Sequence, residues 1–282
     1  MDAFLTDFRY AFRVLFKRPG LTLLAILALA VSLGMSTTAF STLNGIFFKP
    51  LPFKDPDSLQ QIYLRNTKAD LREIPIPYEQ FVELQGADSF SDVMAYFSGT
   101  INISGKGLPE RYDGTFVSTN FLEVLGHAPA IGRTYSEASY EWDGPRELLI
   151  SHAMWRDRYR QDPDIVGTKV LANAVEHTIV GVLPEGFEFP GHSQVWMPIN
   201  ETLLKGERKL ISHVIALGRL APGVTNSEAK AELETYFQGW GSQAVENKED
   251  AELVCEPFGR LQLNRASQSF LVVAMAAVIF VL

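Results

Sequence analysis

Residues 21–48 form an unbroken run of 28 residues without a charged side chain. Folded as an α-helix, this run would be about 42 Å long, whereas the hydrocarbon core of a bilayer is roughly 30 Å thick. A soluble helix of this length would need a polar face, and the run has no charged residue to supply one. The sequence therefore predicts a transmembrane helix over 21–48, which either tilts or extends a turn or two beyond the bilayer.

The residues before this run predict its direction. The first 20 residues contain four basic side chains and only two acidic ones, Asp2 and Asp7. Short basic flanks remain in the cytoplasm, so the N-terminus is expected there. A cleavable signal peptide is the alternative, because Ala28-Leu29-Ala30 has the small residues of a cleavage site. The apolar run continues for another 18 residues, however, and the apolar region of a signal peptide has only about 7–15. This length favours an uncleaved anchor.

Residues 1–18 carry a second pattern, in which a basic row and an apolar row both recur at helical spacing. The basic row is Arg9, Arg13 and Lys17, and the apolar row is Phe4, Phe8, Ala11, Phe12 and Leu15. A helix of this kind lies in the membrane interface with its basic side chains toward the lipid head groups. Pro19 and Gly20 then break it before the predicted span begins. We therefore expect a cytoplasmic interfacial amphipathic helix over 1–18.

The chain becomes acidic after the predicted span. From Lys49 onward it contains 21 Lys and Arg against 31 Asp and Glu, a net charge of −10. An acidic segment without a basic stretch is a poor nucleic-acid binder, so we expect no nucleic-acid partner. The one cysteine, Cys255, cannot form an internal disulfide and gives no information on the compartment. The predicted topology alone places residues 49–265 outside the cytoplasm.

Residues 49–265 contain short strands and helices in no regular βαβ order, after an exposed proline-rich loop over 49–59. The expected strands are 60–66, 91–118 with turns at Gly99 and 105–107, 146–151, 167–189 as a hairpin turning at Asn173-Ala174, 194–199, 213–220 and 251–258. The expected helices are 77–86 with Phe81 and Leu84 inward, 119–126 capped by Thr119, 152–159 capped by Ser151, and 225–245 with Ala229, Leu233, Tyr236 and Phe237 on one face. This mixture predicts an α+β domain with mainly antiparallel sheets.

The order of these segments resembles the permease subunit of MacB/FtsX-type ABC transport systems. Residues 8–53 are similar to the first helix and first span of that family. Residues 109–135, 148–159, 162–190, 195–199 and 216–233 are similar to successive pieces of its MacB-like periplasmic core domain. The chain most resembles the duplicated orphan permease group, which carries no ATPase on its own chain.

This resemblance implies a function. Members of the family have four spans per unit, an ATPase that docks on a cytoplasmic loop between later spans, and a periplasmic domain that ATP hydrolysis moves as a mechanical lever. Residues 266–282 are uncharged and largely apolar, but too short to complete a span, so we expect them to be the outer part of a truncated second span. We therefore predict the N-terminal fragment of a permease in the bacterial inner membrane. Its predicted partners are the lipid bilayer, a separate ABC ATPase subunit, and further permease spans or a second permease copy.

Two other classes of function fit parts of the sequence. A single-span anchored binding or scaffold module needs only the span and an extracytoplasmic domain. A membrane-anchored hydrolase needs a catalytic constellation as well. Ser151-His152 has the residue types of a nucleophile and a base, but sequence neighbours rarely face each other and no G-x-S-x-G motif surrounds the serine. Capping of the helix that follows is the favoured role of Ser151.

Other candidate sites are weaker still. His177 and His192, with Glu185 and Glu188 between them, have ligand types that suit a metal, but a strand histidine and a loop histidine near surface carboxylates are the favoured interpretation. Residues 99–107 resemble a phosphate loop, but the glycine spacing is wrong. The carboxylate pairs Glu185/Glu188 and Glu246/Glu249 have spacings common on any acidic surface. We therefore predict no catalytic, metal-binding or cofactor-binding residue, and no enzyme activity.

The remaining features predict packing. Four tryptophans are expected in the core or an interface: Trp142, Trp155, Trp196 and Trp240. Residues 181–190 are expected to form a turn between strands. Within the predicted span, Ala30, Gly34 and Thr38 repeat small side chains on one helical face. Such a face lets another membrane helix approach closely.

Overall fold

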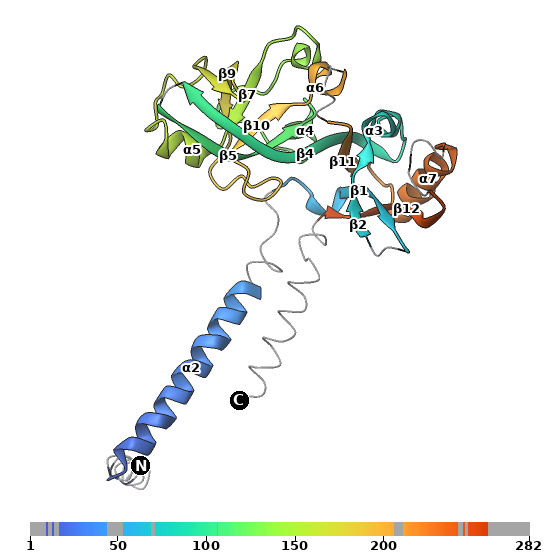
Figure 1. The fold of residues 1–282 in the computed structure, drawn as a ribbon. Helices are drawn as coiled ribbons and strands as arrows, with labels where there is room; N and C mark the ends of the chain where they lie inside the picture. Colours follow the sequence, from blue (N-terminus) through green and yellow to red (C-terminus); the bar gives the residue numbers. More distant parts are fainter. Residues whose placement is uncertain are drawn as a thin grey trace. The chain divides into compact units, whose positions relative to one another are not determined.

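The computed structural model describes residues 10, 13, 17–43, 53–68, 71–105, 107–205, 211–241, 245 and 248–258. The chain divides into two compact units, of which the first comprises 1–50 and 262–282 and the second comprises 51–261. We call the second unit the core domain. Every strand that the structure describes belongs to it (Figure 1).

The first unit contains helix α2, Pro19–Leu43, which is 25 residues long (Figure 1). Among the described residues, no helix has both the length and the apolar character needed to cross a membrane. The span over 21–48 therefore remains a prediction. In the predicted interfacial helix over 1–18 only four residues are described, and the predicted second span over 266–282 lies outside the described residues.

The described strands of the core domain form one sheet. Its main path runs β12-β1-β11-β4-β5-β10-β7-β9-β6, while β2 pairs with β1, β3 with β11, and β8 with both β4 and β9. The strands are β1 Leu59–Asn66, β2 Leu71–Ile74, β3 Ile76–Pro77, β4 Phe90–Gly105, β5 Gly107–Val117, β6 Ile131–Gly132, β7 Glu147–Ile150, β8 Lys169–Ala172, β9 Val175–Val182, β10 Val195–Pro198, β11 His213–Leu220 and β12 Ala251–Pro257. The β10–β5 and β7–β9 pairs are parallel, and the other described pairs are antiparallel.

The long strand β4 joins the two halves of this sheet (Figure 1). Its first half pairs with β11 and its second half with β5. Gly99 lies inside the second half, opposite Gly114, so the turn predicted at Gly99 is wrong and the strand turns only at 105–107. Close packing explains the second glycine, because a Cβ on Gly114 would lie 2.4 Å from Cδ1 of Ile101.

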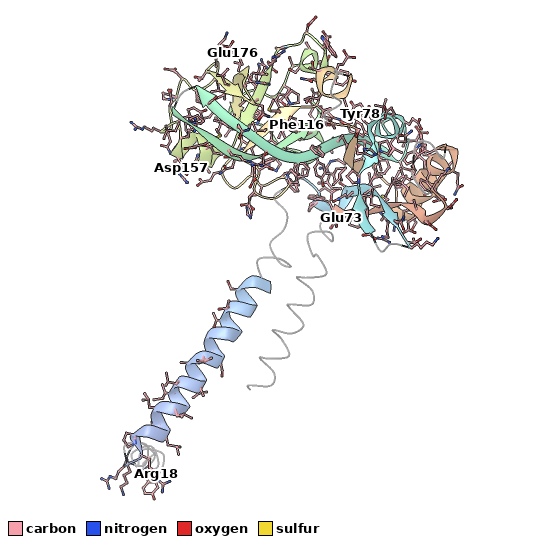
Figure 2. The ribbon with its side chains drawn as sticks, viewed as in Figure 1. Arg18, Glu73, Tyr78, Phe116, Asp157 and Glu176 are labelled. Atoms are coloured by element: carbon pink, nitrogen blue, oxygen red, sulfur yellow. The ribbon has the colours of Figure 1, made fainter. Side chains whose placement is uncertain are left out.

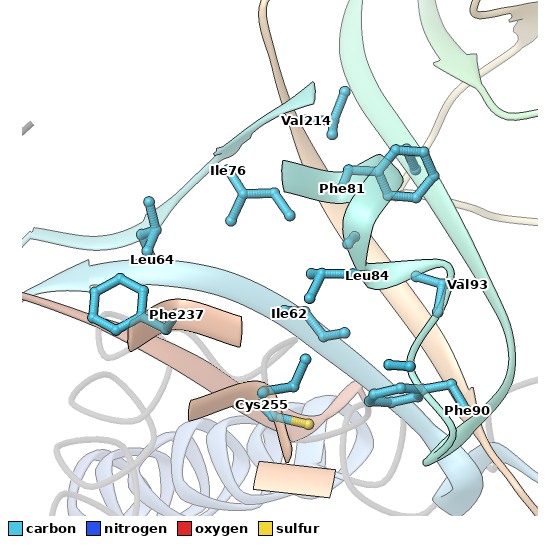
Figure 3. Close-up of a cluster of buried hydrophobic side chains, with 14 of the residues drawn as sticks. Ile62, Leu64, Ile76, Phe81, Leu84, Phe90, Val93, Val214, Phe237 and Cys255 are labelled. Carbon is cyan, nitrogen blue, oxygen red and sulfur yellow. The ribbon is translucent and has the colours of Figure 1, made fainter. Parts of the chain in front are cut away.

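Helices pack on the sheet around three buried clusters. The first cluster contains Ile62, Phe81 and Phe237 (Figure 3) and lies beneath helices α3, Tyr78–Leu84, and α7, Asn226–Gly239. The second is built around helix α4, Phe121–Leu125, and the third includes helix α5, His152–Asp157. The short elements are α6 Glu201–Lys205, η2 Pro56–Ser58, η3 Glu137–Tyr140 and η4 Lys248–Asp250.

The predicted α+β class and the mainly antiparallel pairing are confirmed. The predicted Ser151 cap is also confirmed, because its side chain accepts a hydrogen bond from a backbone N–H group three residues later. Thr225, for which no cap was predicted, caps α7 in the same way. The hairpin turn at 173–174 is present, with φ of 50° and 65°, which suits a two-residue turn between antiparallel strands.

Two further local predictions are wrong. Helix α4 is preceded by Asn120 rather than capped by Thr119, and Asn120 makes no side-chain capping bond. Its amide instead bonds Asp92 and the Val93 carbonyl on β4, so a tertiary contact replaces the cap. Helix α7 ends at Gly239 instead of near 245, because buried Trp240 takes an extended conformation and anchors in the first cluster.

Candidate functional site

The first and last described strands of the core domain are neighbours. Strand β1 begins soon after the first described residues of the domain, and β12 is the last strand that the structure describes. The two strands are antiparallel neighbours, with Gln60 opposite Pro257. The start of β1 and the end of β12 therefore lie side by side, although almost the whole domain separates them in sequence.

Aromatic rings from these two ends pack against each other. Phe53, before β1, and Phe258, after β12, have ring centroids 6.1 Å apart. Both contact Phe189, at 6.1 and 5.7 Å, and Phe53 also contacts Phe187 and His127. We call Phe53, His127, Phe187, Phe189 and Phe258 the neck cluster. Several of its ring pairs are edge-to-face, an arrangement that stabilises aromatic pairs beyond the burial of their area.

The neck cluster corrects one prediction and adds detail to another. Phe53 is only 6% exposed, so the loop predicted to be exposed over 49–59 contributes a core residue. Residues 181–190 do form a turn, but Phe187 and Phe189 within it are buried. The indole Nε1 of Trp196 donates to the Phe189 carbonyl at 2.7 Å, which fixes this loop against β10.

Arg219 on β11 connects helix α4 to the segment before β1, and we call these contacts the Arg219 bracket. Its Nε and one terminal nitrogen donate to the Val124 carbonyl at 2.9 and 2.6 Å. The other terminal nitrogen donates to the Ser58 Oγ at 2.6 Å and to the Asp55 carbonyl at 3.2 Å. Val124 belongs to the last turn of α4, whose carbonyls have no partner within the helix. Burial lowers the pKa of Arg219, but a guanidinium remains protonated in proteins.

The residues considered for catalysis and metal binding have local roles. The Ser151 Oγ accepts from the Met154 N–H at 3.0 Å, so it caps α5 as predicted. The His177 ring is buried in β9 with Nδ1 2.9 Å from the Val175 carbonyl, whereas His192 is exposed and 3.7 Å from Glu188. Across the described parts of the chain, no three metal-ligating side chains are grouped.

The other candidate residues are dispersed. Residues 99–105 belong to β4, not to a phosphate loop. Glu249 lies in η4, and Glu246 lies outside the described residues. Trp196 and Trp240 are buried as predicted and Trp155 is partly buried, but Trp142 is 49% exposed. In α2 the side chains at 30, 34 and 38 are exposed, so their predicted contact remains a prediction.

Residues 22–236 match the family model of the MacB-like periplasmic core domain. The chain belongs to this family. Its fold resembles the crystal structure of the extracellular domain of the noncanonic ABC-type transporter YknZ from Gram-positive bacteria (TM-score 0.54, 15% identity, 70% of this chain and 99% of that one). It also resembles the periplasmic region of MacB from Actinobacillus actinomycetemcomitans (TM-score 0.56, 13% identity, 77% and 93%). No curated protein matches the sequence significantly.

In this MacB-like domain a cleft of about 650 Å³ lies beside α5. The side chain of Arg158 is only 8% exposed there. It donates to the Glu110 carboxylate at 2.9 Å and to the Leu108 carbonyl at 3.0 Å, and its guanidinium lies 5.8 Å from the Tyr112 ring centroid. These contacts connect the C-terminal end of α5 to β5, so Arg158 and Glu110 stabilise the fold. The family match is to a MacB-like periplasmic core domain, and the absence of enzyme activity remains a prediction.

No prediction from the sequence included the neck cluster or the role of Arg219. A signal was present for Phe53 and Phe258, because they are the first and last aromatic residues of the predicted domain over 49–265. Nothing in the sequence indicated that they would meet. The role of Arg219 depends on three segments that come together only in the folded chain.

Proposed function

We propose that the chain is a permease subunit of an ABC-type system in the bacterial inner membrane, and that its core domain is an extracytoplasmic lever. In this proposal a separate ABC ATPase hydrolyses ATP in the cytoplasm, and the movement of the membrane helices displaces the core domain. The domain in turn acts on a substrate or a partner protein. Membership of the MacB-like family supports this proposal.

The neck cluster is the observation that supports the proposed lever function. A lever needs a stiff joint where the driving helices meet the driven body. Phe53 and Phe258 stand at the two ends of the domain and are packed in one buried cluster. Protein interiors are close-packed and transmit displacement with little compression. Movement of either end is therefore passed to the whole sheet through β1, β12 and the Arg219 bracket.

Helix α2 supports the proposed membrane anchor. It contains no charged residue, and its leucines at 21, 23, 24, 27, 29 and 33 are exposed. Some of its hydroxyl groups are bonded within the helix, since Ser32 Oγ donates to the Ala28 carbonyl at 2.7 Å and Thr37 Oγ1 to the Leu33 carbonyl at 2.8 Å. Such internal bonding is what a helix in hydrocarbon requires. We propose the membrane span over 21–48, with the N-terminus in the cytoplasm.

A reporter fusion tests the orientation. Alkaline phosphatase fused near Gly206 is expected to be active, because that enzyme needs the oxidising extracytoplasmic compartment. Green fluorescent protein fused at the N-terminus is expected to fluoresce. Phosphatase activity that is absent near Gly206, with intact fusion protein, would contradict the proposed topology.

A distance measurement tests the lever. The chain is purified in nanodiscs with the ABC ATPase that copurifies with it, and a fluorophore pair is attached at a cysteine replacing exposed Val166 in two copies. Addition of ATP is expected to change the transfer efficiency, and Phe53→Ala with Phe258→Ala is expected to reduce that change while ATP hydrolysis continues. If no ATPase copurifies, or if ATP leaves the distance unchanged, the chain is an anchored binding module instead.

A further inference from the structure

A second cleft, of about 450 Å³, opens on the part of the core domain that carries α3. This volume lies in the range of ligand-binding clefts, about 300–1,000 Å³. The cleft is lined by Tyr78, Glu79, Val82, Tyr140, Leu204, Ile211 and Ser212. These residues come from α3, η3, α6 and the segment before β11, elements far apart in sequence. None of them belongs to the neck cluster or to the Arg158 cleft.

The floor of this cleft is fixed. Leu204 and Ile211 are 7% and 3% exposed and belong to the first buried cluster. The Ile211 N–H donates to the Leu203 carbonyl at 3.2 Å, and the Tyr78 N–H donates to the Ser212 carbonyl at 3.0 Å. These bonds join α6 and α3 to the same segment. Because the backbone is tied on both sides, the cleft is formed before any partner arrives, which reduces the entropic cost of binding.

The walls and rim have the composition of a protein-binding surface. Tyr78, which Figure 2 labels, and Tyr140 both line the cleft, and aromatic side chains present apolar ring faces to a partner. Val82 is 48% exposed at the rim, and Trp142, two residues beyond Tyr140, is 49% exposed. The Trp142 carbonyl accepts from Thr202 Oγ1 on α6, which holds that segment near the cleft. Tyr and Trp are enriched where partner proteins bind.

Two of the four elements that line the cleft are acidic. Helix α3 and the segment 137–143 contain no Lys or Arg but contain five carboxylates: Glu79, Glu83, Glu137, Glu141 and Asp143. Residues 201–212 contain two carboxylates and three basic side chains, so the excess of negative charge comes from α3 and 137–143. A second copy of this chain is a poor occupant, because its residues from 49 onward carry a net charge of −10 and like charges oppose association. The charge on α3 and 137–143 matches a basic partner instead.

We propose that this cleft docks a protein segment with a bulky apolar side chain flanked by lysines or arginines. The apolar side chain lies on Leu204 and Ile211 between the two tyrosine rings. The flanking basic residues face the carboxylates on α3 and on 137–143. This site goes beyond the proposed lever, because it specifies a recognition surface that does not require ATP-driven movement.

Fluorescein-labelled peptides test the proposal by anisotropy on the full chain in nanodiscs. The peptide KKLFLKK is expected to bind at least about tenfold more tightly than KKGSGKK, which lacks the apolar anchor, since one buried apolar side chain is worth about that factor. The charge-reversed peptide EELFLEE is expected to bind more weakly than KKLFLKK by a similar factor. Rising salt is expected to weaken KKLFLKK binding, because rim charges are screened.

Matched substitutions locate the site. Val82→Asn is expected to weaken KKLFLKK binding about tenfold, whereas Val166→Asn, at a valine of similar exposure (41%) elsewhere on the domain, is expected to leave it unchanged. Equal thermal midpoints of the two variants show that folding is preserved. Equal binding of the three peptides, or equal effects of the two substitutions, overturns the proposal. Light scattering that shows a dimer dissociated by Val82→Asn overturns it as well, because a second copy would then occupy the cleft.

Discussion

Removing the Phe53 ring from the neck cluster is expected to destabilise the core domain and to weaken the packing of Phe258 after β12. Phe53 is 6% exposed and contacts four other rings. Phe53→Ala is therefore expected to cost about 3–5 kcal/mol of unfolding free energy, the usual cost of truncating a buried phenylalanine. In a domain of this size each kcal/mol lowers the melting temperature by about 2–4 °C, so a decrease of about 6–20 °C is expected.

The specific claim is that Phe53 and Phe258 stabilise each other. Their centroids are 6.1 Å apart and they share Phe189 as a neighbour. Aromatic pairs of this kind contribute about 0.5–1.5 kcal/mol beyond area burial. The double variant is therefore expected to be destabilised by about 1 kcal/mol less than the sum of the two single variants.

Urea unfolding of residues 51–261, followed by tryptophan fluorescence, measures these energies. Trp196 is a suitable reporter because its ring lies 5.6 Å from that of Phe187 in the neck cluster. The control cycle combines Phe53→Ala with Phe81→Ala, since Phe81 is equally buried but belongs to a different cluster. That pair should be additive to within about 0.5 kcal/mol. If Phe53 and Phe258 are also additive to that limit, the two ends are not coupled and the neck cannot act as one joint.

Three further expectations concern single side chains. Burial would raise the pKa of Glu147, but hydrogen bonds from Arg133, Ser139 and the Ser136 N–H lower it overall. The ionised carboxylate therefore stabilises the folded domain at pH values above the ordinary glutamate pKa of about 4.3. This stabilisation is lost as pH falls through the lowered pKa. Urea titrations should therefore show a shallower acid decline in Glu147→Gln. Burial lowers the pKa of His177, so the folded domain should lose stability as pH falls below about 6.5 toward that lowered pKa, and His177→Asn should remove this part of the profile. Ser151→Ala should lower the unfolding free energy by about 1 kcal/mol through loss of the α5 cap, while Ser151→Asp, which retains a capping oxygen, should restore it in the same assay.

Predictions succeeded where the deciding contact is local. Ser151 accepts a hydrogen bond from a backbone N–H group three residues away, and the turn at 173–174 joins neighbouring strands. They failed where a distant segment intervened. The cap of α4 was misassigned because Asn120 bonds Asp92 and Val93 on β4. The four tryptophans were expected in the core or an interface, and only the tertiary structure leaves Trp142 half-exposed while it buries Trp196 and Trp240.

The sequence by itself determined the uncharged apolar run, the order and type of most elements, and the family. These follow from periodicity, charge and hydrogen bonds within a few residues, which any chain of this sequence must satisfy. Only the tertiary structure decided which strands are neighbours. It therefore also decided that the rings of Phe53 and Phe258 are in contact and that Tyr78 and Tyr140 line the same cleft. Long-range pairing depends on the packing of many surfaces at once, because each contact contributes little and the total decides the arrangement. The joint and the docking cleft are properties of that arrangement.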